Sequence, residues 1–154
     1  MRVDFVKLFV DSTSGLLEEV LGERVEVSAV AMKAGPVTGR EVLVVIRLDG
    51  EAQGQVVFDM DAPTAVGMAG HMIGEGSRGM TPLVGSSIAE LASMAIGRAI
   101  SRINDRGARL SMTPPTVFTA ADLDANDPPL ETLVAPIRTA SGEVRVNVTI
   151  RDLG

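Results

Sequence analysis

The sequence predicts a two-layer α/β fold in which helices cover a largely antiparallel sheet. Segments with helical and strand-like periodicity follow one another in the order helix, three strands, two helices and three strands. Each half of the chain therefore offers a helix followed by three strands, which indicates a pseudo-twofold arrangement. A length of 154 residues suits one domain with one core, spanning residues 1–154.

The first half begins with a helix. Apolar residues recur at nearly helical spacing over Val3–Leu21, and Gly22 follows as a stop signal. A short helix over Pro63–Ile73 ends this half, with Asp61 as its N-cap. Between the two helices we expect three strands, the last of them preceded by a turn at Asp49-Gly50: Val25–Met32, Glu41–Leu48 and Gln55–Met60.

The second half opens with the longest helix, from Thr81-Pro82 to about Arg106. Three strands should follow: Ala108–Met112, with or without an extension across Pro114-Pro115 to Phe118, then Leu130–Thr139 and Glu143–Ile150. The last of these alternates cleanly between apolar and polar residues, which favours a position at the edge of the sheet. A second copy of the chain could pair with such an edge, so we expect a homodimer.

Composition excludes several classes of protein. The net charge is −6 and the only aromatic residues are four phenylalanines, which argues against a nucleic-acid partner. No apolar run approaches the roughly 20 residues that span a bilayer, and the N-terminus lacks a signal-peptide layout, so we expect no membrane insertion. The absence of Cys fits the cytoplasm, and one histidine, His71, leaves no multi-His metal site within the chain.

The longest predicted helix has two contrasting faces. One is a broad apolar stripe that must pack on the sheet or on other helices: Val84, Ile88, Leu91, Ala92, Ala95, Ile96, Ala99, Ile100 and Ile103. The opposite face carries a single charge among small side chains, with Met94 at its border: Ser86, Glu90, Ser93, Gly97, Ser101 and Asn104. Either another protein approaches this face closely, or a helix or a dimer mate covers it.

The same helix carries a recognisable motif. In the segment SSIAELASMAIGRAI, Ser86-x-x-x-Glu90-x-x-Ser93 resembles the signature helix of the CheX/CheC/FliY chemotaxis phosphatases, which reads Asp or Ser, three residues, Glu, two residues, Asn. Three further segments resemble that family, namely Leu110–Val117, Gly54–Phe58 and Glu18–Gly22. The resemblance covers nearly the whole chain, and a single signature helix favours the CheX branch and its CheC-like fold.

The resemblance implies an activity and a partner. These proteins dephosphorylate the aspartyl phosphate of CheY-type response regulators by inserting the signature helix into the regulator's active site. Glu90 would pair with the regulator's phosphate-site lysine, and the residue at the Asn position would orient the attacking water. The regulator supplies the magnesium ion, so no cofactor or metal of this chain is expected. The implied docking residues are Ser86, Glu90, Ser93, Met94, Gly97 and Ser101.

This sequence departs from the signature where it matters for chemistry. Ser93 occupies the Asn position, and a serine hydroxyl is shorter than a carboxamide and offers a single donor. Misplacing an attacking water by about 1 Å can lower the rate by ~10²-fold. Three interpretations therefore stand: a phosphatase in which Ser93 takes the Asn role, a regulator-binding module that has lost hydrolysis, and a dimeric structural scaffold.

Overall fold

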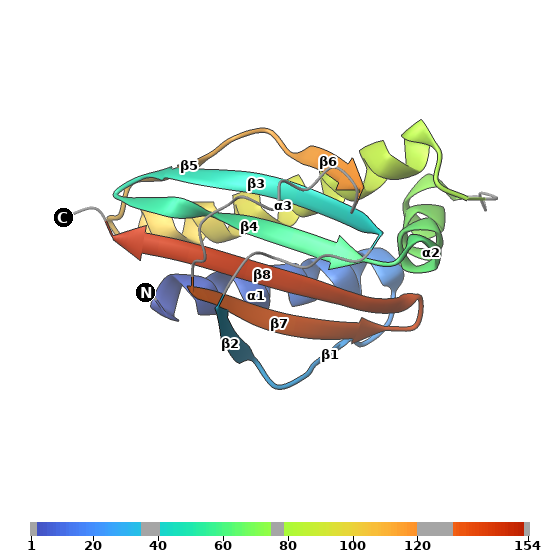
Figure 1. Ribbon diagram of the computed structural model, residues 1–154, viewed down its shortest axis with the longest axis horizontal. Coiled ribbons are helices and arrows are strands. Elements are labelled where there is room, and N and C mark those ends of the chain that lie inside the picture. Colours follow the sequence, from blue (N-terminus) through green and yellow to red (C-terminus); the bar gives the residue numbers. More distant parts are fainter. Residues whose placement is uncertain (1–2, 35–40, 75–78, 120–130, 153–154) are drawn as a thin grey trace.

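Helices and an eight-stranded antiparallel sheet form two layers in the computed structural model, which describes residues 3–34, 41–74, 79–119 and 131–152 (Figure 1). Helices α1 (Val3–Leu21) and α3 (Pro82–Asp105) lie along one face of the sheet, and α2 (Ala62–Ile73) stands at one end. The strands in chain order are β1 (Glu26–Val27), β2 (Ala31–Ala34), β3 (Val42–Gly50), β4 (Ala52–Met60), β5 (Leu110–Met112), β6 (Thr116–Thr119), β7 (Glu131–Thr139) and β8 (Gly142–Asp152).

The strand order has the predicted pseudo-twofold symmetry. Along the sheet the strands run β1-β7-β8-β4-β3-β5, with β2 also paired to β7 and β6 also paired to β3. If each strand is replaced by its counterpart in the other half (β1 by β5, β3 by β7 and β4 by β8, and the reverse), the same order is read backwards, with β4 and β8 side by side at the centre. The short strands of each half pair with a long strand of the other half, so the sheet is shared rather than divided.

The predicted strand Val25–Met32 is two short strands, which corrects the expected count of three strands in the first half. β1 and β2 both pair with β7, but the registers Val27↔Ile137 and Ala31↔Val134 leave one extra residue on their side of the ladder. Pro136 lies opposite this interruption and has no N–H to donate, while its carbonyl accepts from the Ser28 N–H at 2.8 Å. In the second half, Pro114-Pro115 lies in the gap between β5 and β6.

The prediction that Glu143–Ile150 forms an edge strand is wrong. These residues belong to β8, which lies between β7 and β4 in the interior of the sheet. Alternation arises here because Val144, Val146, Val148 and Ile150 face the helices while the intervening residues face the other way. The edges among the described strands are β1 with β2 and β5 with β6, so a homodimer joined through an edge strand, which stays a prediction, would use one of those.

The helices are held by an apolar layer against the sheet. Every member of the stripe predicted on the longest helix is buried in α3. By length and hydropathy alone α3 could cross a membrane, but half of the relevant window is buried inside the protein, as expected for a core helix. The predicted N-cap is confirmed at α2, where the carboxylate of Asp61 accepts from the Thr64 N–H at 2.9 Å.

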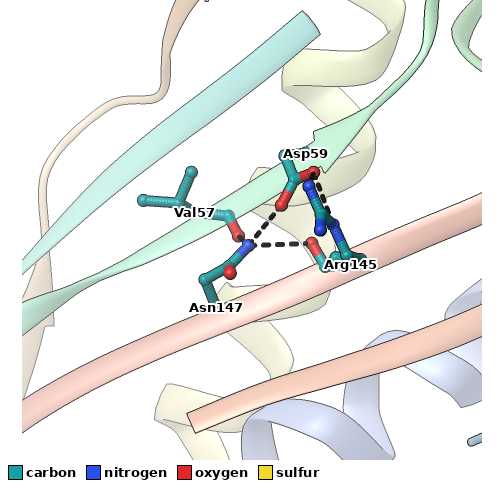
Figure 2. A network of polar contacts seen from close by, with 4 residues as sticks. All are labelled: Val57, Asp59, Arg145 and Asn147. Carbon is teal, nitrogen blue, oxygen red and sulfur yellow. Dashed lines mark hydrogen bonds and ion pairs between the residues drawn. The ribbon is translucent and has the colours of Figure 1, made fainter. Parts of the chain in front are cut away.

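A buried ionic network joins the two central strands on the face of the sheet away from the helices (Figure 2). The fully buried carboxylate of Asp59 in β4 accepts from Nε and Nη2 of Arg145 in β8, at 2.8 and 2.6 Å. Asn147 donates to the same carboxylate at 2.6 Å and to the Val57 carbonyl at 3.0 Å. Because a one-residue slip would turn these groups into the apolar core, the network fixes the β4–β8 register.

We expect Arg145→Met to lower the free energy of unfolding by about 3 kcal/mol, because it leaves the buried Asp59 carboxylate without its cation. The matched change Arg138→Met, at an exposed arginine of β7, should stay within about 0.5 kcal/mol of the natural protein. Urea denaturation followed by circular dichroism measures both. A loss below about 1 kcal/mol for Arg145→Met would show that the network contributes little to stability.

Candidate functional site

The residues implied as docking contacts lie together on the outer face of α3, and we call them the docking strip: Ser86, Glu90, Ser93, Met94, Gly97 and Ser101. Ser86, Glu90, Met94 and Ser101 are exposed, whereas Ser93 and Gly97 are half-buried. A methyl group built at Gly97 would meet no atom within 4 Å, so the surface over the middle of the strip is open. No helix of this chain covers it among the described residues, which leaves another protein or a dimer mate to approach this face.

Capping and packing at both ends of α3 fix the direction of the docking strip. Thr81 caps the first turn by accepting from the Val84 N–H at 3.2 Å, and Pro82 occupies the first turn of the helix. At the other end, Asn104 exchanges two hydrogen bonds with the backbone of Leu110 in β5, at 2.9 and 3.0 Å. Asn104, which the sequence also placed on this face, therefore anchors α3 to the sheet.

The polar groups of the strip differ from their neighbours in having no protein partner. Beside the strip, Arg98 pairs with Glu19 of α1 at 2.9 Å, and Ser87 donates to the Leu83 carbonyl at 2.8 Å. Within the described residues, no hydrogen bond or ion pair engages the side chains of Ser86, Glu90, Ser93 or Ser101. A carboxylate and three hydroxyls on one rigid face are thus available to an incoming partner.

The side chains on this face can act chemically by positioning a cation or a water molecule. In the described part of the chain, no group of three or more His, Cys, Asp or Glu residues could hold a metal ion. Glu90 can accept hydrogen bonds from a cation, and the Ser93 hydroxyl one turn away can hold a water molecule. The apolar cavity between α1, α3 and the sheet measures about 10 Å³, room for one water at most and not for a substrate.

Sequence reasoning missed two apolar side chains beside the strip. Leu83, in the first turn of α3, is 57% exposed, more than Met94 of the strip at 40%. Val117 of β6 is also exposed, and it lies 4.0 Å from the position of a methyl group built on Gly85. The seven-residue spacing from Leu83 to Glu90 could have revealed Leu83, because seven residues make nearly two helical turns and place both side chains on one face. No local spacing could have revealed Val117, because only the folded structure brings β6 beside α3.

Family comparison supplies the context for this geometry. A family model described as chemotaxis phosphatase CheX matches residues 42–138, well over half of the chain. The chain belongs to the CheX family. The match runs from the start of β3 into β7 and includes the whole docking strip. No curated protein matches the sequence.

Solved structures share the CheX fold at low sequence identity. The CheX of a CheX-CheY-BeF3-Mg+2 complex from Borrelia burgdorferi has a TM-score of 0.83 at 23% identity, covering 98% of this chain and 100% of that one. A CheC-like superfamily protein from Shewanella sp. PV-4 has a TM-score of 0.84 at 19% identity, covering 98% and 99%. Thermotoga maritima FliY is more distant, with a TM-score of 0.68 at 15% identity, covering 90% and 82%.

The open space over Gly97 leads to a stability prediction. Gly97→Ala should raise the free energy of unfolding by about 0.5–1 kcal/mol, because alanine favours the helix over glycine and the new methyl group meets nothing. Gly67→Ala in α2 is the matched control, since its methyl group would meet Ser141 Oγ at 3.0 Å and so should gain less. Urea denaturation of both variants measures the difference. An equal gain in both, or a loss in Gly97→Ala, would contradict an open strip.

Proposed function

We propose that this CheX-family protein docks the strip of α3 onto a phosphorylated CheY-type response regulator and promotes hydrolysis of its aspartyl phosphate. The observation that supports the proposal most directly is the pair Glu90 and Ser93, which lie one turn apart on an open face with no partner among the described residues. Glu90 would form a charge-assisted hydrogen bond with the lysine beside the regulator's phosphate, and Ser93 would orient the attacking water.

The proposed reaction needs little from this chain beyond positioning. A water molecule attacks the phosphorus atom, the bond from phosphorus to the aspartyl oxygen breaks, and inorganic phosphate leaves with the regulator's carboxylate restored. The regulator would carry the magnesium ion and the phosphoryl group, so this chain contributes neither a nucleophile nor a cofactor. Catalysis would then come from holding the water in line with the bond that breaks.

Both partners of the proposed complex have support. Family membership indicates a chemotaxis phosphatase, and the Borrelia burgdorferi structure is a complex of CheX with CheY. Exposed Met94 and Leu83 beside Glu90 supply apolar area that a protein partner could cover. A cytoplasmic location and a homodimer through β1 with β2, or through β5 with β6, complete the proposal.

Ser93 is the reason to retain the alternative of a regulator-binding module without hydrolysis. Its side chain is short and half-buried, so a water held by its hydroxyl lies closer to the helix axis than one held by an asparagine carboxamide. Glu90 is exposed and keeps the docking contact. The protein could therefore bind a phosphorylated regulator as a phosphate sink or adaptor without hydrolysing it. In the remaining alternative, a dimeric scaffold, a second copy covers the strip.

The decay of a phosphorylated CheY-type regulator from the same source tests the proposal. The natural protein should accelerate decay, and Glu90→Ala should lower the effect at least tenfold, as expected when a charge-assisted hydrogen bond worth about 1.5–3 kcal/mol is lost. Ser93→Asn should accelerate decay further, by up to ~10²-fold, by moving the water outward. Glu51→Ala, at an exposed carboxylate in the β3–β4 turn, is the matched control and should change nothing.

Each other outcome selects an alternative. No acceleration by the natural protein, with phosphorylation-dependent binding and decay restored by Ser93→Asn, would indicate a docking module that has lost hydrolysis. Absence of binding to the phosphorylated regulator, by the natural protein and by every variant alike, would leave the scaffold. Acceleration that survives Glu90→Ala would remove the docking strip from the mechanism.

A further inference from the structure

A groove of about 370 Å³, lined mostly by polar and charged residues, lies on the face of the sheet away from the helices. It sits at the end of the sheet where the β3–β4 turn lies beside the end of β8, which is the left-hand end of the sheet in Figure 1. Its lining includes Arg47 of β3, Gln53 and Gln55 of β4, and Thr149 and Arg151 of β8. The register places Arg47, Gln55 and Thr149 in one row across three strands and Gln53 beside Arg151 in the next.

The two arginines of the groove are not paired with a carboxylate, unlike Arg145 on the same face, which pairs with buried Asp59. Arg138, farther along this face, has Glu26 and Glu143 opposite it in the register of the sheet. The side chains of Arg47 and Arg151 make no hydrogen bond or ion pair among the described residues, and their neighbours on β4 are glutamines.

The lining of the groove holds more cationic than anionic side chains. Its one acidic residue, Asp49, accepts a hydrogen bond from the Gly50 N–H at 2.8 Å, so the two arginines face a single carboxylate. In a chain of net charge −6, two uncommitted guanidinium groups around one groove form a local excess of positive charge.

We propose that this groove binds a phosphorylated small molecule of about the size of a nucleoside monophosphate. Guanidinium groups match the geometry of phosphate oxygens and hold them with paired hydrogen bonds. The carboxamides of Gln53 and Gln55 offer donors and acceptors for the uncharged part of the ligand. A volume of about 370 Å³ falls within the usual range for small-molecule sites.

The strands hold the groove rigidly and place it apart from the docking strip. Thr149 in its floor is buried and hydrogen-bonded to Thr132 of β7 at 2.9 Å, and the Arg47 N–H donates to Thr113 Oγ1 at 3.1 Å. The docking strip faces outward from the helical layer, whereas the groove opens on the opposite side of the sheet. A bound ligand would therefore leave the strip free, and the two sites can be tested independently.

Isothermal titration calorimetry of the full chain at physiological salt tests the proposal, with adenosine monophosphate, inorganic phosphate, adenosine and succinate as probes. Adenosine monophosphate should bind more tightly than inorganic phosphate, with no binding of adenosine or succinate. Arg47→Gln combined with Arg151→Gln should weaken binding at least tenfold, because the charge-assisted hydrogen bonds to the phosphate are lost. Arg138→Gln is the matched control, and Glu90→Ala should leave binding unchanged.

Three kinds of result would overturn the proposal that the groove binds a phosphorylated small molecule. Failure of both phosphate probes to bind excludes the site, and equal binding by succinate excludes selectivity for phosphate. Binding that persists in the double variant, or that falls equally in Arg138→Gln, places the ligand elsewhere. The melting temperature of the double variant, followed by circular dichroism, should match that of the natural protein, which separates a lost site from a lost fold.

Discussion

The antiparallel pairing of β4 with β8 is the constraint on which the rest of the structure depends. It joins the two halves of the chain at the centre of the sheet, and its two faces have opposite chemistry. Towards the helices, Val56 and Phe58 meet Val146 and Val148, while on the other face Asp59, Arg145 and Asn147 satisfy one another. A shift of one residue would bury the charges in the apolar layer, so the register is specified from both sides.

The position of the docking strip follows from that register. The apolar stripe of α3 must meet the valines and isoleucines that the central strands present, which leaves the strip facing outward. Asn104 holds one end of the helix to β5, and Arg98 ties its flank to Glu19 of α1. The helix therefore offers Glu90 and Ser93 from a rigid support. A site that acts by orienting another protein's water needs such a support, because its contribution is geometric.

The sequence predicted local features well and distant ones poorly. The helices, the Asp61 cap and the two faces of α3 were correct because helical periodicity and capping depend on residues a few positions apart. The edge position of Glu143–Ile150 was wrong because alternation reports burial on one face and says nothing about neighbouring strands. Pro136, which interrupts the strand predicted over Val25–Met32, and Arg145, 86 residues from its partner Asp59, act across distances that no local pattern records.

The interleaved sheet also governs when this protein can fold. The short strands of each half pair with a long strand of the other half, and β4 pairs at the centre of the sheet with β8, which comes last among the described strands. During synthesis, the β3–β4 pair therefore emerges well before β8, so the β8-facing backbone of β4 stays unpaired and apolar side chains of both strands are exposed. Long-range pairing of this kind makes folding slow and leaves an aggregation-prone intermediate. The growing chain is therefore most exposed to aggregation until translation has passed β8.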